Sequence, residues 1–144
     1  MLNSLGRPGV LVHGVALKPG KPTIIGLADG KPVFGLPGHP LSAMISFHRI
    51  VRPILRRLGG EVDLFEPMVS ARLARKVPSD AGRTEYVRVR LVEDAGDFLA
   101  EPLFGKSAAL SSLIAARGLV EVPLGVEAST RGRRCGCCCC RQEP

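Results

Sequence analysis

The change of residue pattern at Gly59-Gly60 is the feature that most constrains the fold of this 144-residue chain. Before this pair, apolar residues between Leu41 and Leu58 recur at steps of three and four, which is typical of an amphipathic helix. After it, residues 69–77 and 85–92 alternate between apolar and polar side chains, as half-buried strands do. We therefore predict an α/β segment followed by a small all-β segment, with a boundary near residues 61–67.

The α/β segment begins with strands. Residues 10–16 form a short, mostly apolar run that predicts a buried parallel strand. Residues 23–27 and 32–36 flank Asp29-Gly30, a pair that is typical of a tight hairpin turn. These patterns predict a strand, a Gly/Pro-rich loop and then a hairpin.

A helix should follow the hairpin. Pro40 suits the first turn of a helix, and Gly59-Gly60 suits its end. Pro53 lies inside the pattern and is expected to kink the helix or to split it in two, because it lacks a backbone N–H donor. In the all-β segment the remaining predicted elements are a turn at 95–97, strands at 98–102 and 119–122, and a short helical patch at 109–116.

Two loops carry the residues that are best suited to binding a ligand. The first is Lys18-Pro-Gly-Lys-Pro22, and the second opens the segment Gly35-Leu-Pro-Gly-His-Pro-Leu-Ser-Ala43. Pro fixes φ and Gly permits positive φ, so both loops should be stiff and sharply bent. Stiff loops with fixed positive charge beside a helix N-terminus suit a tetrahedral oxyanion or a phosphate. Either loop alone would be read as a solvated surface turn. The loop-forming residues are Pro19, Gly20, Gly35, Pro37, Gly38 and Pro40.

Composition excludes several classes of protein. The net charge of +7 favours anionic partners, but the basic residues are scattered and do not interleave with aromatics, so we expect no nucleic-acid partner. No apolar run approaches the roughly 20 residues that cross a bilayer, and the N-terminus lacks the features of a signal peptide. We expect no membrane partner and a cytoplasmic location. Paired carboxylates, a nucleophile beside a base and a Gly-rich nucleotide loop are all missing from the pattern, so we name no catalytic residue and no metal ligand.

Four segments of the chain, in order, resemble one family. They are Gly14-Val-Ala-Leu-Lys-Pro-Gly-Lys-Pro22, Lys31-Pro-Val-Phe-Gly-Leu-Pro-Gly-His-Pro-Leu-Ser-Ala43, Arg83-Thr-Glu-Tyr-Val-Arg88 and Lys106-Ser-Ala-Ala-Leu-Ser-Ser-Leu-Ile-Ala-Ala-Arg-Gly-Leu-Val120. Together they are similar to the molybdopterin molybdenumtransferases, the MoeA and gephyrin E-domain family. His39 stands where Asn is commoner in that family. The resemblance runs from about Leu2 to about Arg131.

The resemblance implies a fold, a reaction and a set of contacts. Residues 1–62 resemble the C-terminal part of the molybdopterin-binding α/β/α domain, and residues 63–134 resemble the family's C-terminal β-barrel domain. The implied reaction is the insertion of molybdate into adenylated molybdopterin during molybdenum cofactor biosynthesis, in a homodimer. The implied contacts to molybdate and molybdopterin are Lys18, Lys21, Pro22, Ser42, Arg83, Arg88 and Ser107. Alignment leaves the choice between Arg83 and Arg88 open, and Ser42 can also be read as an N-terminal cap.

Part of the family's pattern is missing from this sequence. A relative of full length carries a long preceding segment with an acidic motif for nucleotide and Mg²⁺, so the ligands of that implied cofactor are absent here. We expect the chain to be a gene fragment, a product of a mis-assigned start or one half of a split protein. The alternative function is an inactive or split remnant that binds molybdopterin or a partner protein.

The five cysteines all lie between Cys135 and Cys140. They have no second ligand pair for a zinc or iron–sulfur site, and neighbouring cysteines cannot join distant segments by disulfides. The family's barrel ends in an acidic and apolar strand where this chain has Gly132-Arg-Arg-Cys-Gly-Cys137. The most economical hypothesis is a frameshift near Gly132, with a metal-binding or redox tail as the alternative. We expect residues 135–144 to be an aberrant, disordered tail.

Overall fold

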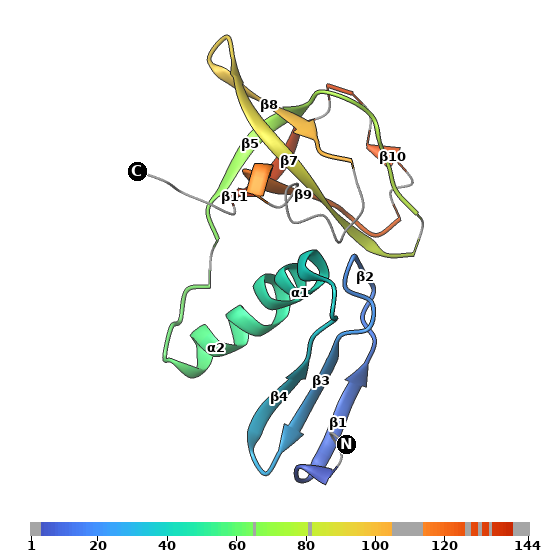
Figure 1. Cartoon of the computed structure of the whole chain (residues 1–144). Coiled ribbons are helices and arrows are strands. Elements are labelled where there is room, and N and C mark those ends of the chain that lie inside the picture. The colour runs from blue at the N-terminus through green and yellow to red at the C-terminus, as the bar shows by residue number, and fades with distance from the viewer. Residues whose placement is uncertain are drawn as a thin grey trace. The chain divides into compact units, whose positions relative to one another are not determined.

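The computed structural model describes residues 4–64, 66–80, 82–104, 114–125, 128–129, 131–132 and 134–139. The chain divides into two compact units, residues 1–64 and residues 65–144. We call them the first and the second unit and describe each by itself. The fold is mixed α/β: the first unit combines strands with a helical segment, and the second is a small β-barrel (Figure 1).

The first unit is built on an antiparallel sheet of β1 (Pro8–His13), β3 (Ile24–Ala28) and β4 (Lys31–Gly35), in the order β1-β3-β4. The short strand β2 (Leu17–Lys18) precedes β3. The predicted hairpin turn between β3 and β4 is confirmed, because Asp29 and Gly30 both have positive φ, of 48° and 81°. The backbone N–H of Arg7 donates to Asp29 Oδ1 over 2.9 Å and ties the start of β1 to this turn.

The prediction of a buried parallel strand at 10–16 is wrong. The strand is antiparallel to β3, and the side chains of Leu11 and Val12 are 59% and 41% exposed. The reason is the length of the connection: only residues 14–23 separate β1 from β3, and parallel neighbours need a crossover of about a dozen residues or more. An apolar run therefore predicted the strand but not the direction of its partner.

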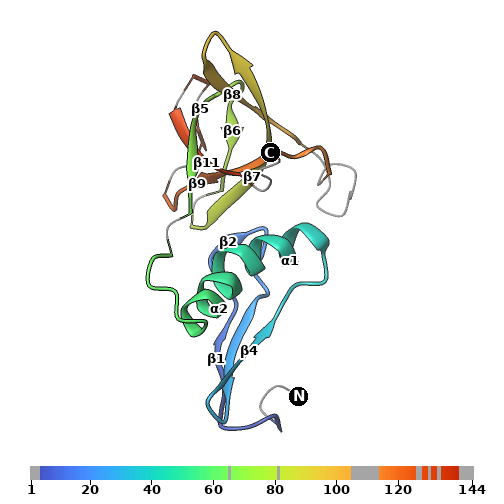
Figure 2. The same ribbon diagram turned by 90° about the vertical axis from the view of Figure 1, so that its left-hand side faces the viewer.

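The helical segment has three parts. Helix α1 (Pro40–Ser46) continues through a π-helical turn η2 (Phe47–Val51) into α2 (Arg52–Leu58). Pro53 splits the helix as predicted, because the π-helical turn lies just before the point where the Pro53 N–H is missing. Gly59 and Gly60 end the helix as predicted. The Gly59 N–H donates a hydrogen bond to the Leu55 carbonyl, and Gly60 has a φ of 91°. Figures 1 and 2 show the segment on one side of the sheet.

The second unit is a closed β-barrel. Its strands are β5 (Met68–Leu73), β7 (Thr84–Asp94), β8 (Asp97–Pro102), β9 (Gly118–Val122) and β11 (Arg134–Cys139). They follow the order β7-β8-β5-β11-β9, and a further pairing of β7 with β9 closes the ring. The pair β5–β8 is parallel, and the other pairs are antiparallel. Closure leaves the ring without an unpaired edge.

Most of the predicted strands of the second unit are confirmed. The turn at 95–97 forms between β7 and β8, with Ala95 and Gly96 at positive φ. The run 69–77, predicted as one strand, is divided: β5 ends at Leu73, and a two-residue strand β6 (Val77–Pro78) pairs with β10 (Ala128–Ser129) instead. Most of the predicted helical patch at 109–116 lies outside the described residues.

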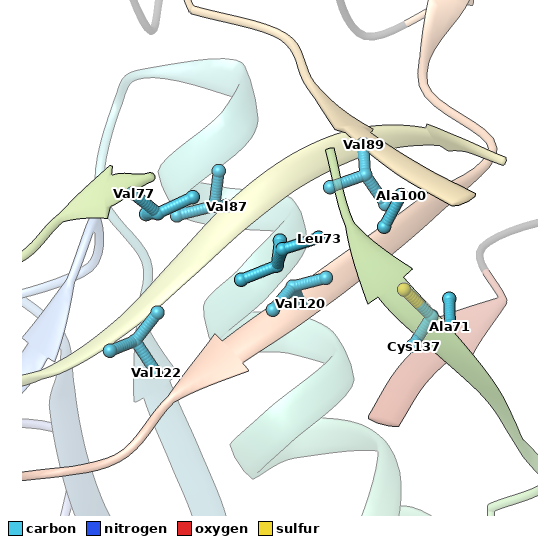
Figure 3. Close-up of a cluster of buried hydrophobic side chains, with 9 residues drawn as sticks. All are labelled: Ala71, Leu73, Val77, Val87, Val89, Ala100, Val120, Val122 and Cys137. Carbon is cyan, nitrogen blue, oxygen red and sulfur yellow. The ribbon is translucent and has the colours of Figure 1, made fainter. Parts of the chain in front are cut away.

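The barrel core is aliphatic, as expected from a chain with 4% aromatic residues and no Trp. Figure 3 shows side chains from the barrel strands and β6 pointing toward one another in the interior. Leu73, Val89 and Ala100 have no exposed surface, and Val120 and Val122 are each 1% exposed. The side chains that make up the cluster are Ala71, Leu73, Val77, Val87, Val89, Ala100, Val120, Val122 and Cys137.

The expectation of a disordered tail is wrong for residues 135–139. They belong to β11, which pairs with β5 on one side and β9 on the other. Cys137 has no exposed surface and belongs to the core, and the Cys135 thiol donates to the Ala71 carbonyl over 3.3 Å. A hydrogen bond from Cys137 lowers the pKa of Cys135. Cysteine packs as a small hydrophobe, so the sequence Cys-Gly-Cys can form a barrel strand that has small, partly apolar side chains.

Within the described part of the chain, no helix is both long and apolar enough to span a membrane.

Leu73 offers a test of the core. We expect Leu73→Ala to lower the free energy of unfolding by about 2–5 kcal/mol, because it leaves a cavity in a closed core. The matched control is Leu124→Ala, since Leu124 is 59% exposed and its truncation should change stability by less than about 0.5 kcal/mol. Chemical denaturation of both variants measures the difference. Equal losses would show that Leu73 is not part of the core.

The place of β11 offers a second test. Removal of residues 133–144 should abolish cooperative unfolding of the second unit, because it deletes a strand that is paired on both sides. Removal of residues 140–144 keeps all of β11 and should preserve cooperative unfolding. Thermal unfolding followed by circular dichroism distinguishes the two. A cooperative transition of the second unit in the longer deletion would mean that the barrel does not need this strand.

Candidate functional site

The KPGKP loop, residues 18–22, joins β2 to β3 as a tight turn. Lys18 is half-buried, whereas Lys21 and Pro22 are exposed. Three backbone hydrogen bonds hold the loop: the Val15 N–H donates to the Lys21 carbonyl over 2.9 Å, the Gly14 N–H to the Thr23 carbonyl over 2.9 Å, and the Thr23 N–H to the Gly20 carbonyl over 3.1 Å. The expected stiffness of this loop therefore has a structural basis in addition to its prolines.

Gly20 is required for the shape of the loop. It is buried, and its φ of 135° is one that residues with a side chain rarely adopt. A Cβ at this position would lie 3.0 Å from Ser46 Oγ and 3.4 Å from Leu17 Cβ. The loop backbone thus packs directly on helix α1, and only glycine fits there without displacing its neighbours.

Two buried hydroxyl groups connect the loop to the helix. Thr23 Oγ1 donates to the Gly20 carbonyl over 2.7 Å, and it lies 2.7 Å from Ser46 Oγ. Neither residue has exposed surface. Neither hydroxyl was predicted from the sequence. A signal was present, because Ser46 follows Ser42 by one helical turn among apolar residues, but a serine in a helix does not by itself reveal its partner.

The second loop, residues 35–40, leads from β4 into α1. Pro37 is buried, while Gly38, His39 and Pro40 are exposed. His39 occupies the N-cap position, so Ser42 is the third helical residue and not the cap. The Ser42 side chain is 7% exposed. The first unit therefore holds Lys18, Lys21 and Ser42, and the hydroxyl pair links the loop of the two lysines to the helix that carries Ser42.

The other predicted contacts belong to the second unit. Arg83 is half-buried just before β7, and Arg88 lies on β7 with 5% exposure. Burial lowers the pKa of the Arg88 guanidinium, which still remains charged at neutral pH. Ser107 lies outside the described residues. The predicted contacts therefore come from both units.

A surface hollow of about 410 Å³ lies in the second unit, and none of the predicted contacts among the described residues lines it. It combines charges of both signs, and one of its arginines, Arg72, is neutralised by Asp94 and Asp97 at 3.4 and 3.2 Å. The hollow is lined by Arg72, Leu73, Ala74, Arg75, Asp94, Leu99, Glu101, Arg131 and Gly132. This hollow and the described residues with the predicted chemistry are thus separate features.

Metal ligands do not gather in the parts of the chain that the structure describes: no group of three or more His, Cys, Asp or Glu residues there can hold an ion. Mg²⁺ prefers octahedral oxygen ligands, usually including carboxylates. The described residues therefore do not fit the Mg²⁺ ion that the resemblance implies.

Comparison with known proteins gives two family matches. The family described as "Probable molybdopterin binding domain" matches residues 2–57, and "MoeA C-terminal region (domain IV)" matches residues 70–135. Among curated relatives, molybdopterin molybdenumtransferases 1 and 2 of Mycobacterium tuberculosis are 38% and 36% identical over 135 and 120 aligned residues. These alignments cover 88% and 82% of this chain but 31% and 29% of the relatives.

Solved structures give the same result. The molybdopterin biosynthesis MoeA protein from Pyrococcus horikosii superimposes with a TM-score of 0.81 at 41% identity, over 99% of this chain and 34% of that protein. A molybdenum cofactor biosynthesis protein from Pyrococcus furiosus gives a TM-score of 0.73 at 33% identity, over 89% of this chain and 44% of that protein. The chain thus spans about a third of the length of the curated relatives it matches. It belongs to the MoeA family as a partial member.

Proposed function

We propose that this chain acts in molybdenum cofactor biosynthesis and contributes to the insertion of molybdate into adenylated molybdopterin. The observation that carries the proposal is the KPGKP loop, which is held as a tight turn and leaves Lys21 exposed. Relatives that are named molybdopterin molybdenumtransferases support it.

Insertion of molybdate requires residues that bind an anion rather than residues that act as acids or bases. Molybdate is a doubly charged tetrahedral anion, and it must be held close to the two sulfurs of the pterin. Ammonium groups on a stiff loop satisfy this requirement, because charge-assisted hydrogen bonds from a preorganised loop need no rearrangement when the anion arrives. In our proposal, Lys18 and Lys21 bind the oxyanion or the pterin phosphate, and Ser42 donates its hydroxyl at the same site.

In our proposal, the second unit supplies further ligand contacts, through Arg83 or Arg88 and through Ser107. A guanidinium presents two parallel donors and suits a phosphate, whereas an ammonium acts as a compact charge. The chain would thus use lysines on the loop and an arginine on the barrel. We also propose, from the family resemblance alone, that the protein is a homodimer.

The alternative is a molybdopterin-binding or interaction module without turnover. The observation that favours it is the lack of an acidic cluster for Mg²⁺ among the described residues. The two functions are distinguished by incubating the purified chain with adenylated molybdopterin, molybdate and Mg²⁺. Formation of molybdenum cofactor supports the enzyme, and binding of the pterin without product supports the module.

The two lysines give a direct test of anion binding. Lys18→Ala and Lys21→Ala should each weaken tungstate binding by tenfold to a hundredfold, because a charge-assisted contact is worth about 1.5–3 kcal/mol. Lys→Arg at either position should restore part of the affinity. Calorimetry at fixed ionic strength measures the affinity, since salt screens these contacts.

Lys31→Ala is the matched control for this test. Lys31 is exposed at the start of β4, beside the Asp29-Gly30 turn, and its loss changes the net charge by the same amount. Tungstate affinity should stay within about twofold of wild type. An equal loss of affinity in the Lys31 variant would show that net charge, rather than the loop, attracts the anion.

Arg83 and Arg88 are distinguished by two measurements. Arg83→Ala should weaken tungstate binding by about tenfold with little change in stability, because its side chain is half-buried and lies outside the core. Arg88→Ala should lower the free energy of unfolding by about 1–3 kcal/mol, because it removes a buried side chain. Arg90→Ala, at an exposed position on the same strand, should change neither quantity. Wild-type affinity in the Arg83 variant would remove this residue from the site.

A further inference from the structure

The hydroxyls of Thr23 and Ser46 form a chain of hydrogen bonds with a defined direction. The Thr23 hydroxyl has one proton, and it donates that proton to the Gly20 carbonyl over 2.7 Å. The contact of 2.7 Å between Thr23 Oγ1 and Ser46 Oγ must therefore use the proton of Ser46. The direction runs from Ser46 on helix α1, through Thr23 just before β3, to the loop.

The series of hydrogen bonds ends at a backbone carbonyl in the centre of the KPGKP loop. The Gly20 carbonyl accepts two hydrogen bonds, one from the Thr23 hydroxyl and one from the Thr23 N–H at 3.1 Å. Both lone pairs of this oxygen are thus engaged, and successive hydrogen bonds in a buried chain strengthen one another. The peptide unit that joins Gly20 to Lys21 is fixed in one orientation as a result.

Helix α1 carries both a proposed ligand contact and the residue that holds the loop. Ser42 and Ser46 are one helical turn apart on α1, so their side chains share a face of the helix. Ser46 holds the loop that carries Lys21, while Ser42 is a proposed ligand contact. Movement of the loop relative to α1 would change the distance between Lys21 and Ser42, and the hydroxyl chain opposes that movement.

We propose that Thr23 and Ser46 are positioning residues, which set the oxyanion affinity of the KPGKP loop without touching the ligand. The proposal rests on the proposed function of that loop. Both hydroxyls are fully buried and their hydrogen bonds lie within the first unit, so their effect on an anion must pass through the backbone at Gly20 and Lys21.

The direction of the hydrogen bonds predicts how strongly each substitution of Thr23 or Ser46 should affect the loop. Thr23→Val keeps the shape of the side chain but removes the bond to Gly20 and the acceptor of Ser46, so it should have the largest effect. Ser46→Ala removes the donor and leaves the bond from Thr23 to Gly20 intact, so its effect should be smaller. Thr23→Ser keeps the hydroxyl and should behave like wild type in the loop, despite the loss of a methyl group.

The experiment combines amide hydrogen exchange with tungstate binding by calorimetry on the 144-residue chain. The reporters are the N–H groups of Val15 and Gly14, which are bonded to the carbonyls of Lys21 and Thr23. We expect their exchange to quicken at least tenfold in Thr23→Val and by less in Ser46→Ala, and to stay near wild type in Thr23→Ser. Tungstate affinity should fall in the same order, by at least fivefold in Thr23→Val.

Ile45→Val is the matched control for lost packing. Ile45 is fully buried on α1 beside Ser46, and this change removes a methyl group without altering a hydroxyl. It should lower stability but preserve the exchange of the two reporters and the affinity for tungstate. If Ile45→Val weakens tungstate binding as much as Thr23→Val, the hydroxyls act only through stability and the proposal is overturned.

The remaining outcomes are also decisive. Unchanged exchange in Thr23→Val would show that the hydroxyl chain does not hold the loop. Faster exchange with wild-type affinity would show that the loop's conformation does not control binding, and this would overturn the positioning role alone. Absence of tungstate binding by the wild-type chain would refute the anion site itself, while the exchange data would still decide whether the hydroxyls hold the loop.

Discussion

The close approach of the Gly20 backbone to Ser46 is the constraint on which the first unit depends. The loop reverses the chain between β1 and β3, and it does so against the side of helix α1. A residue with a side chain at position 20 would require both a rarely adopted φ and a displacement of Ser46. The position of the lysines and the packing of the loop against α1 therefore depend on one glycine.

The second unit depends on a different kind of constraint, which is closure. Five strands of moderate length enclose an aliphatic core without a single aromatic side chain in the described cluster. Such a core is possible because a closed ring satisfies the backbone donors and acceptors of its strands through their neighbours. It also explains why residues as unusual as Cys-Gly-Cys form a strand: their backbone pairs with β5 on one side and β9 on the other, and the small cysteine side chains fit the interior.

The sequence predicted local structure well, but it did not predict which distant strands pair or in which direction. The hairpin at Asp29-Gly30, the split at Pro53 and the turn at 95–97 were predictable, because each depends on residues that are neighbours in the chain. The antiparallel direction of β1 and the ordered β11 were not, because both depend on pairing with distant segments.

The same distinction applies to the candidate site. Lys18, Lys21 and Ser42 were predicted as ligand contacts from the loops and from motif order, whereas the hydroxyl pair of Thr23 and Ser46 was not predicted. Two hydroxyls 23 positions apart in sequence reveal their hydrogen bond only in three dimensions.

The position of β11 in the barrel has a consequence for synthesis. Its partners include β5, whose Ala71 pairs with Cys135, so the ring closes only after this late strand has left the ribosome. Until then β5 and β9 lack a shared neighbour, and the apolar side chains of the core stay exposed to solvent or to chaperones. Pairings between segments so far apart in sequence form slowly, because closing the long loop between them first lowers the entropy of the chain. The strands, the loop and the helix of the first unit all precede β5 in the chain, so they leave the ribosome before the barrel strands do.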